Sequence, residues 1–312
     1  MTSLATYGVN AFLRLVVKRS LSKHALTPER VAAQRAKLER AGARGRWPGA
    51  VSITADTLGA QPAERAALAA PELPHHAVLY LHGGGYLVGS PAVYRPLAAT
   101  LAARLSAPVY TLDYRLAPEH PYPAALNDAY AAYQALRDAG HDPGQIAIMG
   151  DSAGGNLTVA LLQRLRAEGL PLPASAVLLS PWGQLGGSSP SRRAHARKEA
   201  MLPSDRLEEA ARAYAGDVPL EDPRLSVIYG SLEAFPPLMI HVGSEEVLLD
   251  DSQALAAAAH SAGVPCDLTV WKKQPHVFPA FFELLPEGRT ALDACAAFIL
   301  RQWLKAAGPR VG

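Results

Sequence analysis

The pentapeptide Gly150-Asp151-Ser152-Ala153-Gly154 carries the strongest chemical signal in the sequence. It follows the apolar stretch 146–149, which predicts a strand, and it opens a stretch with helical spacing of leucines at 156–168. Between a strand and a helix, Gly-x-Ser-x-Gly is typical of a nucleophile elbow, a strained turn that exposes the serine hydroxyl at a helix N-terminus. We therefore expect Ser152 to act as a nucleophile.

A second glycine-rich motif, His82-Gly83-Gly84-Gly85, directly follows the predicted strand 78–81. Consecutive glycines allow backbone N–H groups to approach a ligand closely. Acyl transfer requires such donors, because its tetrahedral intermediate carries negative charge on oxygen, and one missing donor typically costs on the order of 100- to 1000-fold in rate. The expected oxyanion hole consists of the N–H groups of Gly84, Gly85 and Ala153. The first two residues of the motif, His82 and Gly83, are expected to support it.

The general base should follow the nucleophile in the chain, in the order serine, acid, histidine. Six of the ten histidines precede Ser152, and His195 lies in an apparent insertion. His241 falls within an apolar strand and His260 on a predicted helix. His276 instead lies in a loop after the last predicted strand, where a base should be placed, so we expect His276 to fill this role.

The supporting acid should follow the predicted strand 238–242, where four carboxylates compete. Glu245 and Glu246 lie in the turn. Asp250 and Asp251 begin the next predicted helix, where acidic residues are explained by the helix dipole alone. The acid orients the imidazole and stabilises its cation without taking the proton. The residues alone favour the turn but do not choose between its two glutamates.

Short apolar stretches alternate with helical patterns from residue 77 onward, which predicts an α/β fold with a mostly parallel sheet covered by helices on both faces. The predicted strands are 78–81, 109–112, 146–149, 176–179, 238–242 and 268–271, and the predicted helices are 97–105, 124–139, 156–168, 252–262 and 290–306. An antiparallel hairpin of 51–57 and 63–68 around Gly59 is expected at one edge.

Two segments depart from this alternation. We expect residues 1–46 to form N-terminal cap helices and residues 183–230 to form a cap insertion, with a helix at 205–214 capped by Ser204. The catalytic domain would then comprise 47–182 and 231–312. An insertion at the carboxyl ends of parallel strands lies over the ligand site, so both segments are interpreted as a lid. The alternative is that each is a packing elaboration without contact to substrate.

Composition excludes several classes of protein. The net charge of +2 is scattered and gives no reason to expect a nucleic-acid partner. The two cysteines, Cys266 and Cys295, are too few for a disulfide framework and suit a reducing compartment. No signal peptide or apolar run of about 18 residues is present, which predicts a cytoplasmic protein without an integral membrane segment. No cysteine/histidine cluster suggests a metal, and no cofactor is expected. The basic residues near the start fit an amphipathic helix with a solvated face, or else lipid contact.

Together, these motifs resemble the hormone-sensitive-lipase family of α/β-hydrolases, the bacterial family IV esterases, over roughly residues 45–305. The resemblance rests on the segments 82–86, 113–119, 150–156 and 276–278. It implies a serine carboxylesterase that hydrolyses short- to medium-chain esters, and its register places the acid at Glu246, 30 residues before His276. Two departures stand out: glutamate replaces the usual aspartate, and Val247 replaces the usual proline.

Other functions remain open on these residues. A related serine hydrolase could act on amides, lactones or carbamates, because the triad is common to all of them. Plant gibberellin receptors are similar to this family and bind small molecules without catalysis, but they lack the histidine that is present here as His276. A structural protein with a relict site is the third reading. The expected partner is a small-molecule ester, and a homodimer through the edge strand near 268–272 is one option.

Overall fold

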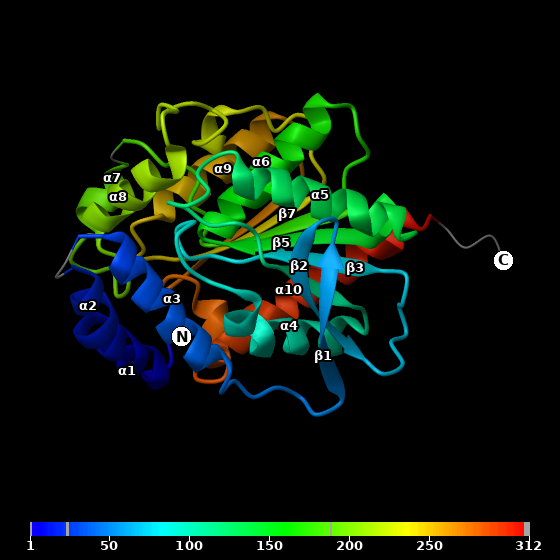
Figure 1. The fold of residues 1–312 in the computed structure, drawn as a ribbon, viewed down its shortest axis with the longest axis horizontal. Coiled ribbons are helices and arrows are strands. Elements are labelled where there is room, and N and C mark those ends of the chain that lie inside the picture. The colour runs from blue at the N-terminus through cyan, green and yellow to red at the C-terminus, as the bar shows by residue number, and fades with distance from the viewer. Residues whose placement is uncertain (1, 23–24, 188, 309–312) are drawn as a thin grey trace.

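The computed structural model describes residues 2–22, 25–187 and 189–308 of the chain. Its centre is one eight-stranded sheet in the order β1-β2-β4-β3-β5-β6-β7-β8 (Figure 1). Strands β3 to β8 run parallel, whereas β2 pairs antiparallel with both β1 and β4. The strands are β1 (Val51–Leu58), β2 (Gln61–Leu68), β3 (Ala77–Leu81), β4 (Val109–Leu112), β5 (Ile146–Asp151), β6 (Ser175–Leu179), β7 (Leu238–Gly243) and β8 (Cys266–Trp271). The predicted α/β fold, with an edge hairpin, is confirmed.

Helices cover both faces of the sheet because successive side chains of each buried strand point to opposite sides. Leu79 and Ile148 pack in one core with α5, α6 and α9, whereas Tyr80 and Met149 pack in a second core with α4 and α10. The two layers are visible above and below the sheet in Figure 1. These helices are α4 (Pro91–Leu105), α5 (Ala124–Asp138), α6 (Ala153–Ala167), α9 (Leu249–Ser261) and α10 (Pro286–Ala306). Single turns of 3₁₀-helix are η2 (Pro143–Gln145), η3 (Val227–Tyr229) and η4 (Phe278–Phe281).

Two local predictions were wrong. Helix α4 begins at Pro91 rather than at 97, because proline is tolerated in the first turn of a helix and Pro96 is accommodated within it. Ser204 does not cap α8 (Ser204–Ala215). Pro203 occupies the N-cap position, and the Ser204 hydroxyl instead donates a hydrogen bond to the carbonyl oxygen of Arg192 at 3.2 Å.

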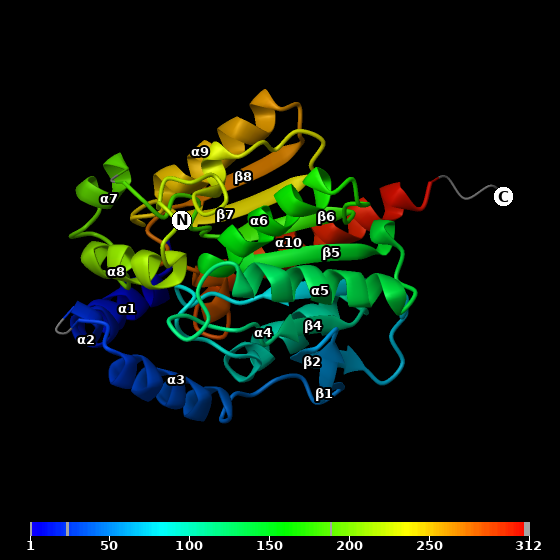
Figure 2. The same ribbon diagram turned by 45° about the horizontal axis from the view of Figure 1, so that its top comes forward.

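The remaining helices lie at one end of the sheet. They are α1 (Leu4–Phe12), the π-helix η1 (Leu13–Lys18), α2 (Arg19–Ser22), α3 (Pro28–Gly42), α7 (Pro190–Ala194) and α8. Helix α2 packs next to α8, although the two are far apart in the sequence (Figures 1 and 2). Hydrogen bonds also join η1 to the connection between α7 and α8: Lys18 Nζ donates to the carbonyl oxygens of Ala196 and Glu199 at 2.6 and 2.9 Å. Among the described helices, none is long and apolar enough to cross a membrane.

Candidate active site

Ser152 lies at the sharp turn between β5 and α6. Its φ of 52° and ψ of −117° fall in a region that is strained for a residue with a side chain. The turn is held in place by the neighbouring strand: the Ser152 N–H donates to the Leu179 oxygen at 2.9 Å, and its carbonyl accepts from the Trp182 N–H at 3.0 Å. The hydroxyl-bearing residue is therefore fixed at the N-terminus of α6, as an elbow requires.

The glycines on either side of the elbow are required by close backbone contacts. A Cβ at Gly150 would lie 2.3 Å from the carbonyl oxygen of Gly154, and a Cβ at Gly154 would lie 1.9 Å from that of Leu81. Both distances are far below van der Waals contact, so a side chain at either position would force strand and helix apart. The sequence spacing thus reflects the packing of β5, α6 and β3 against one another.

His276 and Glu246 form a buried hydrogen-bonded pair. The Nδ1–H of His276 donates to Glu246 Oε2 at 2.7 Å, and the two residues are 2% and 1% exposed. His276 follows β8, and Glu246 follows β7, so two adjacent parallel strands deliver them to the same edge of the sheet. Burial alone would lower the pKa of His276, but the hydrogen bond to Glu246 and its charge raise the pKa above the ordinary value of 6.5.

Ser180 joins the acid to the histidine loop, and the sequence analysis did not single it out. Its hydroxyl donates to Glu246 Oε1 at 2.7 Å and accepts from the Val277 N–H at 3.1 Å. The Gly243 N–H donates to the same carboxylate oxygen at 2.5 Å. Glu246 therefore accepts hydrogen bonds on both oxygens, which fixes its rotamer. The available signal was the position of Ser180, directly after β6 at the edge that carries the elbow.

The loop that carries the expected oxyanion donors adopts a backbone that only glycine accepts readily. Gly84 and Gly85 have φ values of 118° and 63°, and a Cβ at Gly84 would lie 2.0 Å from the Val88 carbonyl oxygen. Ala153 is the first residue of α6, whose N–H has no partner within the helix. These three N–H groups are thus the candidate donors.

His82 is buried behind this loop. Its Nδ1 lies 2.8 Å from the Gly83 carbonyl oxygen, and its ring stacks on Tyr114 with 4.3 Å between centroids. The Tyr114 hydroxyl donates to the His82 carbonyl oxygen at 2.6 Å. Burial lowers the pKa of His82 to about 4, so the ring is neutral at working pH. These contacts support the expectation that His82 and Gly83 position the loop rather than react.

Asp151, the residue before Ser152, fastens the glycine-rich loop to the elbow. One carboxylate oxygen accepts from Tyr80 Oη and from the Gly83 N–H, both at 2.9 Å, and the other accepts from Tyr94 Oη at 3.0 Å. Burial raises the pKa of Asp151 to about 6, while the hydroxyl donors oppose that rise. The pentapeptide alone does not reveal this role, because the partners of Asp151 lie far away in the chain.

Replacing Asp151 with asparagine is expected to lower kcat/KM by roughly 10- to 100-fold, because an amide NH₂ would face donors and loosen the loop that holds Gly84 and Gly85. Turnover of p-nitrophenyl butyrate measures the effect. Tyr80→Phe is the matched control: it removes one donor without adding a repulsion, so its loss should be smaller. A fully active Asp151→Asn variant would rule out this role for Asp151.

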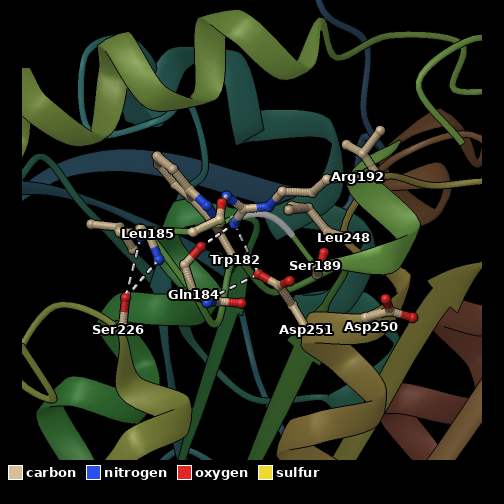
Figure 3. Close-up of polar contacts among 12 residues, drawn as sticks. Trp182, Gln184, Leu185, Ser189, Arg192, Ser226, Leu248, Asp250 and Asp251 are labelled. Atoms are coloured by element: carbon tan, nitrogen blue, oxygen red, sulfur yellow. Dashed lines mark hydrogen bonds and ion pairs between the residues drawn. The ribbon is translucent and has the colours of Figure 1, made fainter. Parts of the chain in front are cut away.

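The other carboxylates of the 243–251 segment lie elsewhere. Glu245 has a side chain that is 27% exposed and lies 3.9 Å from Arg14. Asp250 accepts from the Ser191 N–H at 2.7 Å, and Asp251 forms a buried ion pair with Arg192 at 3.5 Å (Figure 3). Both aspartates begin α9, but the dipole alone does not account for them, since each also anchors the segment that contains α7.

Comparisons with known proteins agree with this fold over most of the chain. A family model described as alpha/beta hydrolase fold matches residues 78–280. The acetyl-hydrolase of Streptomyces hygroscopicus is 44% identical over 222 residues, which cover 71% of this chain and 74% of that protein.

Two solved structures extend the similarity to nearly the whole chain. An esterase from the bacterial hormone-sensitive lipase family has a TM-score of 0.89 at 35% identity and covers 97% of this chain and 99% of its own. EstE5 soaked with p-nitrophenyl butyrate has a TM-score of 0.89 at 34% identity with the same coverage. With this agreement in fold and sequence, the chain belongs to the hormone-sensitive-lipase family of α/β-hydrolases and is a carboxylic ester hydrolase.

Proposed function

We propose that this protein hydrolyses short- to medium-chain carboxylic esters through an acyl-enzyme on Ser152, with His276 as general base and Glu246 as the supporting acid. The observation that carries the proposal is the buried 2.7 Å hydrogen bond between His276 and Glu246. A carboxylate on Nδ1 fixes the tautomer that leaves Nε2 free to accept a proton. The elbow supplies a serine at the same edge of the sheet.

The proposed cycle has two acyl-transfer steps. His276 removes the Ser152 proton as the hydroxyl oxygen attacks the ester carbonyl, and the imidazolium then protonates the departing alkoxide. Water repeats the sequence on the acyl-enzyme, releasing the acid and restoring the serine hydroxyl. The N–H groups of Gly84, Gly85 and Ala153 would stabilise the oxyanion in both steps.

We further propose that residues 1–46 and 183–230 form a cap over this site, on the catalytic domain of 47–182 and 231–312. Support comes from Tyr214 of α8, whose ring stacks on Tyr86 with 3.6 Å between centroids. Tyr86 follows the glycine-rich loop and donates to Asn156 Oδ1 of α6 at 2.6 Å. The insertion therefore packs directly on the residue next to the candidate oxyanion donors.

The candidate walls of an acyl pocket in the two cap segments differ in burial. Leu13 and Tyr214 are buried, whereas Phe12 and Val16 are 58% and 47% exposed. As walls of a pocket, the buried pair is favoured over the exposed pair. A cytoplasmic location stays a prediction, which rests on the free thiols of Cys266, which is half-buried, and Cys295. Pairing through edge strand β8 also stays a prediction, which rests on the family resemblance.

The proposed acyl preference is tested with p-nitrophenyl esters from acetate to palmitate. We expect the highest kcat/KM for short or medium chains, in keeping with a relative named an acetyl-hydrolase and another soaked with a butyrate ester. A maximum at palmitate would contradict the preference. Parallel assays with anilide, lactone and carbamate substrates distinguish the related serine hydrolases, because the proposed enzyme should prefer the ester by the largest factor.

A further inference from the structure

The segment 191–199 of the proposed cap is hydrogen-bonded to the turn that carries Glu246. Three of its side chains, four residues apart in the sequence, reach the backbone of that turn. Ser191 Oγ donates to the Val247 carbonyl oxygen at 2.9 Å, and His195 Nδ1 lies 3.0 Å from the Glu246 carbonyl oxygen. Glu199 Oε2 accepts from the Val247 N–H at 3.1 Å.

Of these three residues, Glu199 is the one whose side chain is a buried carboxylate. It is 1% exposed, and its second oxygen accepts from the N–H groups of Met201 and Leu202 at 2.7 and 3.3 Å. All three hydrogen bonds that reach its carboxylate thus come from backbone donors. Burying a carboxylate costs free energy unless its oxygens are hydrogen-bonded. Donors on both oxygens match the ionised acid, which only accepts hydrogen bonds, whereas the protonated acid would need an acceptor for its O–H.

Glu199 and Glu246 line the same small cavity, which is too narrow to hold a water molecule. Burial, and next the charge of Glu246, raise the pKa of Glu199, whereas His276 opposes the rise. The charge of Glu199 in turn raises the pKa of His276, after the contributions from Glu246. The imidazole therefore lies in the field of three buried carboxylates, those of Glu246, Glu199 and Asp151, and it is hydrogen-bonded to Glu246.

Other charged groups surround the pair. Those facing it from the packed elements are Asp151 at the elbow, His195 in the 191–199 segment, Lys18 of η1, and Lys198, Glu245 and Lys273 in the cavity wall. Lys18 is directed at backbone carbonyls, among them that of Glu199 at 2.9 Å, rather than at the carboxylate. It holds the 191–199 segment against the N-terminal helices.

We propose that Glu199 is a positioning residue of the active site, which fixes the Glu246 turn through the Val247 N–H and whose negative charge supports the His276 imidazolium during acyl transfer. This inference rests on the proposed function. General base catalysis creates an imidazolium in each step, and a second fixed anion stabilises that cation at no cost in reorganisation. A residue that merely capped the 200–202 turn would stabilise the fold without affecting the titration of His276.

The test is the pH dependence of kcat and kcat/KM for p-nitrophenyl butyrate, measured on the full chain. Glu199→Gln removes the charge, so the imidazolium is less stable and the midpoint of the acidic limb should fall by on the order of 0.5 to 1 pH unit. At the same time kcat should fall by roughly 10-fold. Glu199→Asp keeps the charge but shortens the reach to Val247, so it should lower kcat several-fold, ~3- to 10-fold, and leave the midpoint in place.

The matched control is Glu245→Gln, which removes a neighbouring but partly exposed carboxylate and should leave both quantities at their wild-type values. An unchanged midpoint in folded Glu199→Gln, or an equal shift in Glu245→Gln, would overturn the proposal. If Glu199→Gln fails to fold, a folded Glu199→Asp variant with wild-type kcat overturns it equally.

Labelling of Ser152 by a fluorophosphonate separates this inference from the function on which it depends. A wild-type enzyme that is labelled and active, but whose midpoint does not respond to Glu199→Gln, refutes only the role of Glu199. An unlabelled Ser152 refutes the proposed function itself.

Discussion

Ser152→Ala is expected to lower kcat on p-nitrophenyl butyrate by on the order of 10⁴- to 10⁶-fold, because the acyl-enzyme no longer has an oxygen to form on. The fold should survive, since the backbone of the elbow, rather than the hydroxyl, makes the contacts with Leu179 and Trp182. Residual activity would reflect the oxyanion donors and substrate binding alone. Steady-state kinetics and fluorophosphonate labelling, followed by mass spectrometry of the peptide that contains position 152, measure the effect.

A second variant at the same position separates chemistry from backbone strain. Glycine tolerates the φ of 52° found at Ser152, whereas alanine retains the strain of the serine. Ser152→Gly should therefore be as inactive as Ser152→Ala but more stable by about 1 kcal/mol, which corresponds to a rise in Tm of about 2 °C. Substantial ester turnover by either variant would remove Ser152 from the mechanism.

The features that sequence predicted well are those encoded locally. The elbow is one example: apolar residues before Gly150 and regular leucines after Gly154 specify strand, turn and helix within about twenty residues. The parallel sheet follows from the same alternation, because strands buried on both faces are apolar throughout. The start of α4 was missed because it depends on tertiary packing rather than on a local pattern. Pro96 predicts a break when considered alone, but tertiary packing on β2 and β4 holds the helix across it.

The residues that sequence missed act across long separations. Ser180 reaches Glu246 over 66 positions, and Asp151 reaches Tyr80 over 71. No local pattern distinguishes such residues from ordinary polar residues at strand ends. Their partners become neighbours only because the order of strands places β6 beside β7 and β3 beside β5. The choice between Glu245 and Glu246 was likewise open on the residues alone, since either could project from a turn whose backbone was unknown.

Glu246→Gln is expected to lower kcat by on the order of 10³- to 10⁴-fold, because an amide cannot both accept from Nδ1 and stabilise the imidazolium. The glutamate now accepts from the Ser180 hydroxyl and the Gly243 N–H on one oxygen and from His276 on the other. An amide has a single acceptor oxygen, so its NH₂ must face either His276 or the two donors. In the first case the ring is driven toward the wrong tautomer, and in the second the turn is destabilised by about 1 to 3 kcal/mol.

Glu245→Gln makes this a matched comparison, since it changes the adjacent glutamate in the same chemical way. Its carboxylate is partly exposed and approaches Arg14 only at 3.9 Å, so its kcat and kcat/KM should stay within about twofold of wild type. Kinetics on p-nitrophenyl butyrate, with circular dichroism to verify folding, compare the two variants. If Glu245→Gln lost the larger share of activity, the acid would have to be reassigned, and the hydrogen bond between His276 and Glu246 would then be structural. The contrast between neighbouring residues is decisive because both substitutions remove one negative charge from the same turn, and only one of them removes the partner of the imidazole.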